Sequence, residues 1–290
     1  MDKLSRPWRS VLYIPGDKPR ALDKARGLPT DAIIFDLEDA VAPDAKDAAR
    51  ASLGQALAQG GYGPRAGMVR INDLGSPWGR ADLNALSSAR PEAILLPKVE
   101  TAEDVAALAA LMDGSAGFSD TAIWVMMETP AAILNAGAIA SAPRVAGMVM
   151  GTNDLAKDLR CQVNATRSAL QMTLQTCVVA ARAAGIVAVD GVYNAFRDDA
   201  GLTAECAQGR ALGFDGKSLI HPAQLAISNA AFAPSADEID LSRRQIEAFE
   251  EAQTAGQGVA VLDGRIVEAL HVQTARRIIA QSEAIAALEA

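Results

Sequence analysis

The sequence predicts an α/β protein that folds as a (β/α)8 TIM barrel with a C-terminal helix–hairpin–helix extension. Eight short apolar segments alternate with eight helical segments over about 230 residues, which suits a single barrel. The apolar segments are continuous rather than alternating, as expected for parallel strands that are covered on both faces. An open doubly wound sheet is the alternative. The pattern changes near Pro234, so we expect a barrel domain over residues 1–233 and an extension over residues 234–290.

Each expected strand is a short apolar segment that ends in Pro, Gly or a polar residue. These segments are residues 10–16, 31–35, 67–71, 93–96, 122–127, 145–150, 186–189 and 215–220. Helices are expected between them over residues 18–26, 43–59, 78–88, 102–112, 131–140, 164–184, 198–212 and 222–231.

The extension begins with an acidic, proline-containing break at residues 234–240. A helix is expected over 241–253 and a second over 272–288. Between them, Asp263-Gly264 is a strong signal for a two-residue hairpin turn within residues 258–268. The extension is too small to fold alone, and we expect it to serve as a lid or a subunit-contact arm.

Composition excludes several classes of function. The 290 residues carry a net charge of −8 with a pI near 4.9, which argues against a nucleic-acid-binding surface. The three cysteines match no metal motif and fit a reducing compartment. No apolar segment approaches the ~20 residues that a membrane span needs, and the N-terminus lacks the apolar core of a signal peptide. We therefore expect a soluble, cytoplasmic protein.

Charged residues gather where the expected strands end, and in a barrel these ends meet on one face. They are Asp36, Glu38, Asp39, Arg70, Lys98, Glu128, Asp154, Asp190, Lys217 and His221. Glu128 and Asp154 end consecutive strands and are candidates to share one Mg²⁺, which prefers carboxylate and water oxygens. Arg70 is placed to bind a substrate carboxylate. The alternative for each acid is a cap on the helix that follows.

Several familiar chemistries lack their motifs. The chain has no G-x-S-x-G sequence, no Walker loop and no Rossmann glycine fingerprint. Lys98 and Lys217 keep a Schiff-base aldolase open, because both lie at strand ends. His221 is either a site residue or a helix-start residue that bonds loop backbone. His271 is expected to be structural or to lie on the lid surface.

Seven motifs stand in the order seen in one family. They are 9-RSVLYIPG-16, 36-DLEDAV-41, 69-VRIN-72, 96-LPKVE-100, 128-ETP-130, 151-GTNDL-155 and 217-KSLIHP-222. The chain resembles the citrate lyase β-subunit-like branch of the HpcH/HpaI aldolase family, which includes malyl-CoA and citramalyl-CoA lyases. The resemblance implies a (β/α)8 barrel, a trimer or hexamer, and Mg²⁺-dependent cleavage of 3-hydroxyacyl thioesters, with Mn²⁺ as an alternative ion.

The resemblance also implies roles for single residues. Glu128 and Asp154 match the metal ligands, and Arg70 matches the arginine that holds the 2-oxo acid carboxylate. Glu38 and Asp39 match acids that bind metal-coordinated waters. Members of the family place a lid aspartate in a neighbouring subunit's site, and its nearest equivalent here is Glu268, which is one methylene longer.

A basic rim is expected to bind the nucleotide phosphates of coenzyme A. Its candidates are Arg9, Lys18, Arg20 and Arg26, for which a solvated basic face is the alternative.

The sequence therefore predicts a carbon–carbon lyase that cleaves a malyl-, citramalyl- or citryl-type thioester into a 2-oxo acid and acetyl- or acyl-CoA. In the predicted mechanism, a base takes the substrate's hydroxyl proton and Glu268 protonates the departing enolate. Three alternatives remain: a malyl-CoA-type thioesterase on the same site, a 2-oxo-acid aldolase that acts without CoA, and an accessory subunit that docks an acyl-carrier protein.

Overall fold

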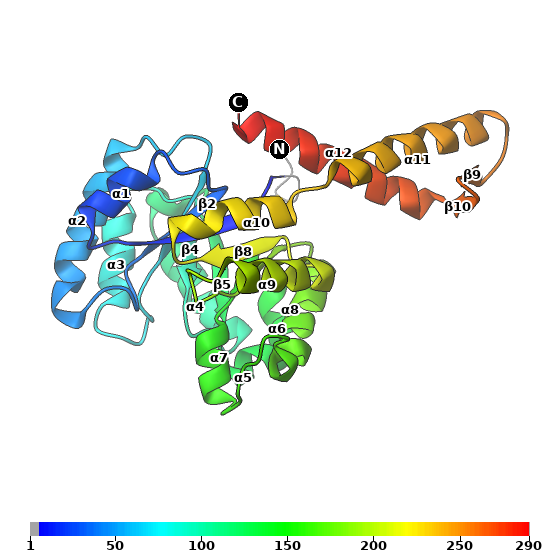
Figure 1. Cartoon of the computed structure of the whole chain (residues 1–290). Coiled ribbons are helices and arrows are strands. Elements are labelled where there is room, and N and C mark those ends of the chain that lie inside the picture. Colours follow the sequence, from blue (N-terminus) through cyan, green and yellow to red (C-terminus); the bar gives the residue numbers. More distant parts are fainter. Residues whose placement is uncertain (1–5, 290) are drawn as a thin grey trace. The chain divides into compact units, whose positions relative to one another are not determined.

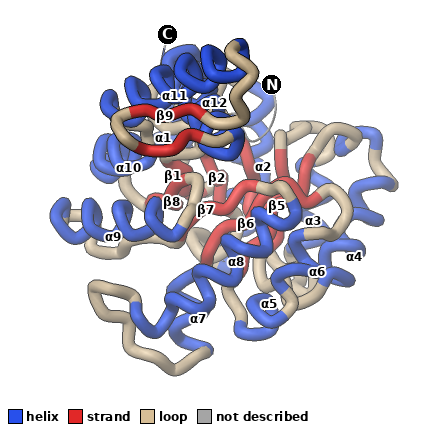
Figure 2. Tube along the Cα trace, turned by 90° about the vertical axis from the view of Figure 1, so that its right-hand side faces the viewer, coloured by secondary structure: helices blue, strands red, loops and turns tan. Residues whose placement is uncertain are grey.

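The computed structural model describes residues 6–289, and its larger unit is a closed barrel of eight parallel strands in sequence order. Figure 2 shows the strands gathered at the centre of this unit, with helices around them. The strands are β1 (Ser10–Pro15), β2 (Ala32–Asp36), β3 (Ala66–Arg70), β4 (Ala93–Leu96), β5 (Ala122–Met127), β6 (Val145–Met150), β7 (Val187–Asp190) and β8 (Gly216–Leu219). The predicted TIM barrel is confirmed.

The strand register sets which side chains meet at the C-terminal end of the barrel. β8 closes the ring on β1, with Ser10 opposite Lys217. Pro15 pairs with Asp36, and Asp36 pairs in turn with Arg70. The last residues of the first three strands therefore lie side by side, which brings an acid and an arginine together on adjacent strands.

Helices follow the strands in the alternating order expected for this fold (Figure 1). The α-helices of the barrel unit are α1 (Pro19–Ala25), α2 (Lys46–Gln59), α3 (Gly79–Leu86), α4 (Ala102–Asp113), α5 (Pro130–Leu134), α6 (Ala136–Ala140), α7 (Thr152–Asp158), α8 (Gln171–Ala184), α9 (Asp199–Leu212) and α10 (Leu225–Phe232). Short 3₁₀ turns are η1 (Pro43–Ala45), η2 (Ala116–Phe118), η3 (Ser168–Leu170) and η4 (Pro222–Gln224).

The barrel has two apolar cores, because successive side chains of each strand point to opposite faces. Leu12, Ile33 and Phe35 belong to the larger core, which also includes buried helix residues. A smaller core includes alternate strand residues and the rings of Trp8 and Trp124, which are tilted by 47° with their centroids 4.8 Å apart. Each strand therefore needs apolar side chains on both of its faces, which explains why the strand sequences are continuously apolar.

The main difference from the expected elements is α7, which occupies a segment predicted to be a loop. Only Thr152 and Leu155 of its seven residues are buried, so the apolar periodicity is too short to signal a helix. Asp154 therefore lies in the first turn of a helix. The following helix begins at Gln171 rather than near residue 164, after Arg167 adopts a left-handed conformation with φ of 50°.

The chain from Ala233 onward belongs to a second compact unit. It contains α11 (Ala236–Thr254), the hairpin strands β9 (Ala260–Leu262) and β10 (Arg265–Val267), and α12 (Ala269–Glu289). Asp263 and Gly264 turn the hairpin with φ of 50° and 74°, as the Asp-Gly signal predicts. Helix α11 begins at Ala236 rather than near residue 241, because Ser235 forms a capping box with Glu238.

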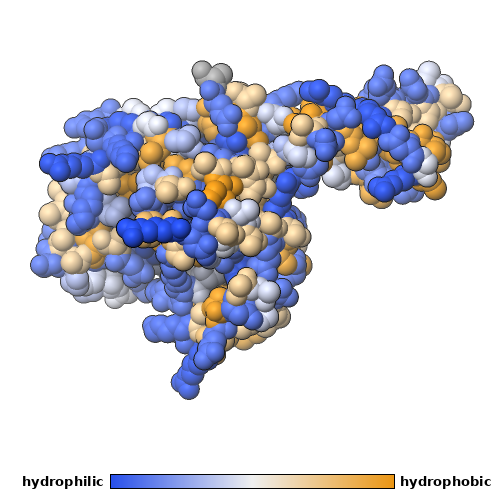
Figure 3. Space-filling model, in the orientation of Figure 1, coloured by the Kyte–Doolittle hydropathy of each residue, from blue (hydrophilic) through white to orange (hydrophobic). Residues whose placement is uncertain are grey.

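This second unit has its own small core and an apolar surface. Phe249, Val267 and Val272 are buried in its core. Val261 and Ile266 of the hairpin are 70% and 63% exposed. In Figure 3, hydrophobic atoms appear at the end of this unit that carries β9 and β10. Within residues 6–289, no helix combines the length and the apolar character needed to cross a membrane.

Candidate active site

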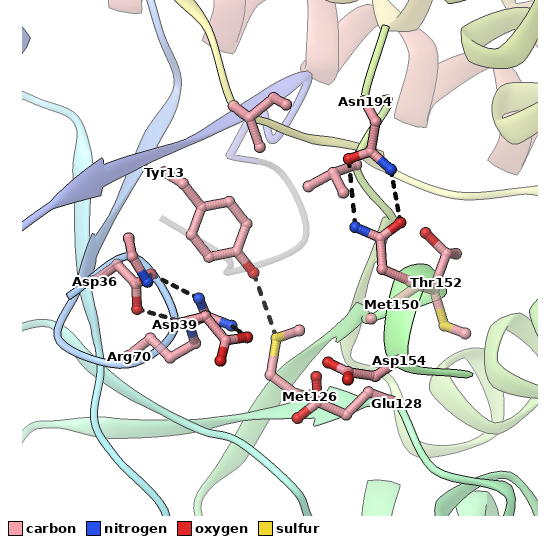
Figure 4. A pocket seen from close by; sticks show the side chains of 15 residues that line it. Tyr13, Asp36, Asp39, Arg70, Met126, Glu128, Met150, Thr152, Asp154 and Asn194 are labelled. Atoms are coloured by element: carbon pink, nitrogen blue, oxygen red, sulfur yellow. Dashed lines mark hydrogen bonds and ion pairs between the residues drawn. The ribbon is translucent and has the colours of Figure 1, made fainter. Parts of the chain in front are cut away.

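A cavity of about 320 Å³ opens at the C-terminal ends of the barrel strands. Figure 4 shows Arg70 and Asp36 on one side of it, and Glu128 and Asp154 close together on another. Its lining residues are Tyr13, Asp36, Asp39, Ala40, Arg70, Met126, Glu128, Met150, Gly151, Thr152, Asn153, Asp154, Val192, Asn194 and Ile220. The end of the barrel predicted to carry the chemistry therefore holds a cavity with charged walls.

Arg70 is buried and held by a two-point ion pair. Its Nε and Nη2 atoms donate to the two carboxylate oxygens of Asp36, at 2.7 and 2.6 Å. Its Nη1 lies 2.8 Å from Glu38 and 3.7 Å from Asp39. Because Asp36 accepts from Nε and Nη2 and Glu38 lies against Nη1, one hydrogen on each Nη atom is left at the far end of the guanidinium for a substrate carboxylate. Asp36 is thus a positioning partner for Arg70.

Glu38 has an unusual proton affinity for a carboxylate. Burial raises the pKa of Glu38 to about 7, helped by the charges of Asp39, Glu128 and Asp36 and opposed by Arg70. Its Oε2 is the oxygen that lies near Arg70 and accepts from the backbone of Asp39. A carboxylate that titrates near neutral pH is suited to act as a general acid or base.

Glu128 follows β5 and is 1% exposed. Its Oε1 accepts a hydrogen bond from the backbone N–H of Lys98, at 2.8 Å. Burial raises the pKa of Glu128 above its ordinary value, against the lowering effect of Lys98 and Arg70. Gly151 makes room for this side chain, since a Cβ there would lie 2.4 Å from the Cβ of Glu128. The absence of a side chain at Gly151 is therefore part of how the acid is positioned.

Glu128 and Asp154 fit a divalent cation. The Lys98 ammonium lies 3.5 Å from Glu128 and 2.8 Å from Asp154, so the two carboxylates already share one positive charge. Within the described residues, no third His, Cys, Asp or Glu joins them in a metal-binding cluster. Two protein carboxylates that leave the other positions to water and substrate are typical of Mg²⁺ sites.

Asp190 and Lys217, which were expected to converge on the site, are instead buried structural residues. Both are fully buried, and Lys217 donates to Asp190 at 3.2 Å and to Glu205 at 2.7 Å. Arg167 adds a second cation, 2.7 Å from Asp190. Lys98 is paired as well, and although burial acts to lower its pKa, Asp154 and Glu128 raise it. Lys98 therefore lacks the depressed pKa of a Schiff-base nucleophile. Lys217 is held in ion pairs with Asp190 and Glu205 and does not line the cavity.

We expect Asp190→Asn to destabilise the barrel by about 3–5 kcal/mol, because it leaves two buried cations short of one anion. Burial acts to raise the pKa of Asp190, but Lys217 and Arg167 outweigh it and the pKa is lowered. The group therefore stabilises the fold above its unfolded pKa, and this contribution is lost as pH falls through the folded pKa. Urea unfolding at pH 7 and below pH 4 measures both effects.

Asp113→Asn is the matched control, since it removes an exposed ion pair with Arg144 and should cost at most about 1 kcal/mol. Equal losses of unfolding free energy in the two variants would contradict a structural role for Asp190.

Both histidines bond backbone groups near helix starts. His221 accepts from the N–H of Ala223 and packs against Phe196, so its helix-start role is confirmed. His271 accepts from the N–H of Glu268. Glu268 itself follows β10 and is exposed within the second unit; its lid role stays a proposal.

The four basic residues expected at a phosphate-binding rim divide into two pairs. Lys18 and Arg20 are exposed at the start of α1, on the side of the barrel where β1 ends. Arg9 precedes β1 and is buried against Asp31, so it does not fit the predicted role. Arg26 follows α1 and donates to the carbonyl of Gly60. Both arginines lie toward the N-terminal ends of the strands, away from the cavity.

The structure adds polar groups that sequence reasoning did not single out. Tyr13 lies beside Arg70, with the guanidinium carbon 5.0 Å from its ring centroid. Asn153 and Asn194 exchange two hydrogen bonds between their side-chain amides, of 3.3 and 2.8 Å. The polar residues in 151-GTNDL-155 were the available signal for Asn153. No comparable pattern marks Asn194.

Comparisons with known proteins agree with this geometry. A model of the HpcH/HpaI aldolase/citrate lyase family matches residues 9–222. A Cereibacter sphaeroides protein named (3S)-malyl-CoA thioesterase is 58% identical over 286 residues, covering 99% of this chain and 98% of that protein. The Escherichia coli citrate lyase subunit beta is 35% identical over 285 residues, covering 96% of this chain and 94% of that protein.

A solved structure extends the likeness to three dimensions. CitE from Mycobacterium tuberculosis, in complex with magnesium, acetoacetate and coenzyme A, has a TM-score of 0.77 and 28% sequence identity. The match covers 97% of this chain and 99% of that one. The family match, the full-length relatives and the closed barrel all support one conclusion. This chain belongs to the HpcH/HpaI aldolase/citrate lyase family.

Proposed function

We propose that this chain is a Mg²⁺-dependent hydrolase of a malyl-type coenzyme A thioester. The observation that carries the proposal is the placement of Arg70 across one cavity from the paired carboxylates Glu128 and Asp154. This arrangement suits a short acid that carries both a free carboxylate and further oxygens. The relative named (3S)-malyl-CoA thioesterase, 58% identical along nearly the whole chain, favours hydrolysis over the lyase reaction expected from the motifs.

Arg70 would bind the free carboxylate of the substrate through the hydrogens at the far end of its guanidinium. Asp36 keeps the guanidinium in a fixed orientation, so little side-chain entropy is lost when the acid binds. Glu128 and Asp154 would hold Mg²⁺, as magnesium is present in the solved CitE complex. When bound, the ion supplies Lewis-acid stabilisation of negative charge that develops on substrate oxygen.

Glu38 is the candidate general base. With a pKa of about 7, a large share of this carboxylate is ionised at neutral pH and can take a proton from an attacking water. Among the described residues, only its Oε2 has hydrogen-bond or ion-pair partners, which leaves Oε1 to accept that proton. Asp39 is more exposed and raises the pKa of Glu38 through its charge.

Glu38→Gln should lower kcat/KM by about 10²–10⁴-fold, the usual range for loss of a general base. In the unsubstituted enzyme, kcat/KM should rise with pH through an apparent pKa no higher than about 7, because a bound cation would lower the pKa of Glu38. In the variant this acidic limb should disappear. A variant that is slower but keeps the same pH profile would contradict the base assignment.

The lyase remains the second candidate, because the citrate lyase beta subunit of E. coli is 35% identical over most of the chain. That reaction would need a group to protonate the departing enolate, for which Glu268 is the sequence candidate.

A trimer or hexamer also stays a proposal, supported by the exposed apolar residues Val261 and Ile266. An acyl-carrier protein is the alternative carrier of the thioester. Lys18 and Arg20 are the remaining candidates for contact with coenzyme A phosphates.

A substrate panel tests the proposed function. Malyl-, citramalyl- and citryl-CoA are each incubated with enzyme and Mg²⁺, and free CoA and 2-oxo acid are followed separately. We expect free CoA from malyl-CoA without glyoxylate, and loss of this activity on addition of a chelator. Glyoxylate together with acetyl-CoA would instead establish the lyase.

A further inference from the structure

Lys98 is held in an uncommon backbone conformation beside the two candidate metal ligands. It follows β4, and its φ of 53° lies in the left-handed region that residues other than glycine rarely adopt. Its backbone N–H donates to Glu128 Oε1, and its side chain returns toward the same oxygen. Two atoms of one lysine therefore converge on one buried carboxylate.

The Lys98 ammonium occupies a position between the carboxylates. Its Nζ lies 3.5 Å from Glu128 Oε1 and 2.8 Å from Asp154 Oδ2. Glu128 is almost fully buried, so its charge is costly without a nearby cation. The charge of Lys98 lowers the pKa of Glu128, against the larger effect of burial. The ammonium is thus a counter-ion to the proposed metal-binding pair.

We propose that Lys98 competes with the divalent cation for this position and thereby sets the affinity of the site for metal. The inference rests on the metal site of the proposed function. A cation held by both Glu128 and Asp154 would have to displace the ammonium, because the two positive charges would repel each other at the same oxygens. The Lys98 side chain is 34% exposed and so has access to solvent when displaced.

The two contacts of Lys98 with Glu128 would then have separate consequences. The backbone hydrogen bond does not depend on the side chain, so Glu128 stays oriented when the ammonium leaves. The ammonium keeps the acids close together and partly neutralised until an ion binds. Lys98 is in this sense a positioning residue that makes metal binding weaker and the metal-free fold more stable.

Lys98→Met tests the inference through metal affinity rather than activity. Mg²⁺ is titrated by calorimetry, and Mn²⁺ by the electron paramagnetic resonance signal of the free ion. We expect the dissociation constant of the variant to fall by about tenfold, since a partly exposed ion pair no longer has to be broken and no ammonium opposes the ion. Lys98→Gln should give the same result and guards against misfolding of the first variant.

Lys157→Met is the matched control. Lys157 is exposed on α7, the same helix as Asp154, and has no ion pair with it in the described residues. This variant removes the same charge and should bind metal with unchanged affinity. Without metal, Lys98→Met should melt at a lower temperature than the parent protein. Saturating Mg²⁺ should then raise the melting temperature of the variant by more than that of the parent.

Two failures are distinguishable. If the parent protein binds Mg²⁺ and both Lys98 variants bind it no more tightly, the competition is wrong while the metal site stands. If neither the parent nor the variants bind Mg²⁺ or Mn²⁺, the metal site of the proposed function is overturned together with the inference.

Discussion

Glu128→Gln and Asp154→Asn should each abolish detectable metal-dependent turnover, with kcat/KM reduced by at least about 10³-fold. Each substitution removes one of the two carboxylates that the chain offers to the ion, and a bound cation contributes several kcal/mol of transition-state stabilisation. The amides keep nearly the same size, so the fold should be retained. In Glu128→Gln the amide oxygen can still accept from the Lys98 N–H. Calorimetric titration with Mg²⁺ should show no binding in either variant.

Glu100→Gln provides the control for these variants. Glu100 lies in the loop between β4 and α4, is exposed, and does not line the cavity. Its loss changes the net charge by the same amount and should leave turnover and metal affinity unchanged. Normal turnover in Glu128→Gln or Asp154→Asn would exclude these residues as the metal site.

Arg70→Ala should reduce both stability and activity. The variant leaves Asp36, which is 1% exposed, without its cation, and removal of one partner from a buried pair costs about 3–5 kcal/mol. The substrate carboxylate also loses its partner, which should lower kcat/KM by about 10²–10³-fold, mainly through a higher KM. Chemical denaturation and steady-state kinetics measure the two effects separately.

Arg70→Lys separates the two roles of the residue. Lysine keeps the charge that Asp36 needs but lacks the planar fork, so it cannot bind Asp36 by two parallel bonds and also present hydrogens to a substrate. We expect most of the stability to return while KM stays high. Full recovery of KM in Arg70→Lys would mean that Arg70 acts only as a charge, and the proposed carboxylate contact would be wrong.

The barrel could be predicted from the sequence because each strand is a separate apolar segment that ends at a clear polar boundary. The same boundaries located Glu128, Asp154 and Arg70 at the C-terminal ends of the strands. Parallel strands that close into a ring bring these ends together, whatever the details of the loops. The convergence of these three residues on one cavity therefore followed from chain order alone.

Residue pairing could not be predicted in the same way. Asp190 and Lys217 also lie at strand ends, but their side chains are buried and paired with each other, and Asp190 accepts a further hydrogen bond from Arg167. Arg167 comes from a loop with a left-handed residue, and nothing in the sequence pairs that loop with β7. Strand-end position thus predicts which face of the barrel a residue is near, but not whether its side chain points into the cavity or into the wall.

The sequence also could not show at which end of the barrel each basic residue lies. Lys18 and Arg26 are eight positions apart in the sequence and were expected to form one rim. They lie at opposite ends of α1: Lys18 precedes the helix and Arg26 follows it. Only Lys18 is therefore on the side of the barrel that holds the cavity. Asn194 lies in a loop without apolar periodicity, and its pairing with Asn153 depends on how two loops meet.

Hydrolysis of malyl-CoA in water enriched with ¹⁸O is the most direct test of the proposed reaction. If water attacks the thioester carbonyl, the released malate should carry one ¹⁸O atom in the carboxylate that was bonded to sulfur, and the molar yield of free CoA should equal that of malate. Mass spectrometry of malate, with a thiol assay in parallel, measures both. Appearance of glyoxylate and acetyl-CoA in place of labelled malate would contradict the account and identify the enzyme as a carbon–carbon lyase.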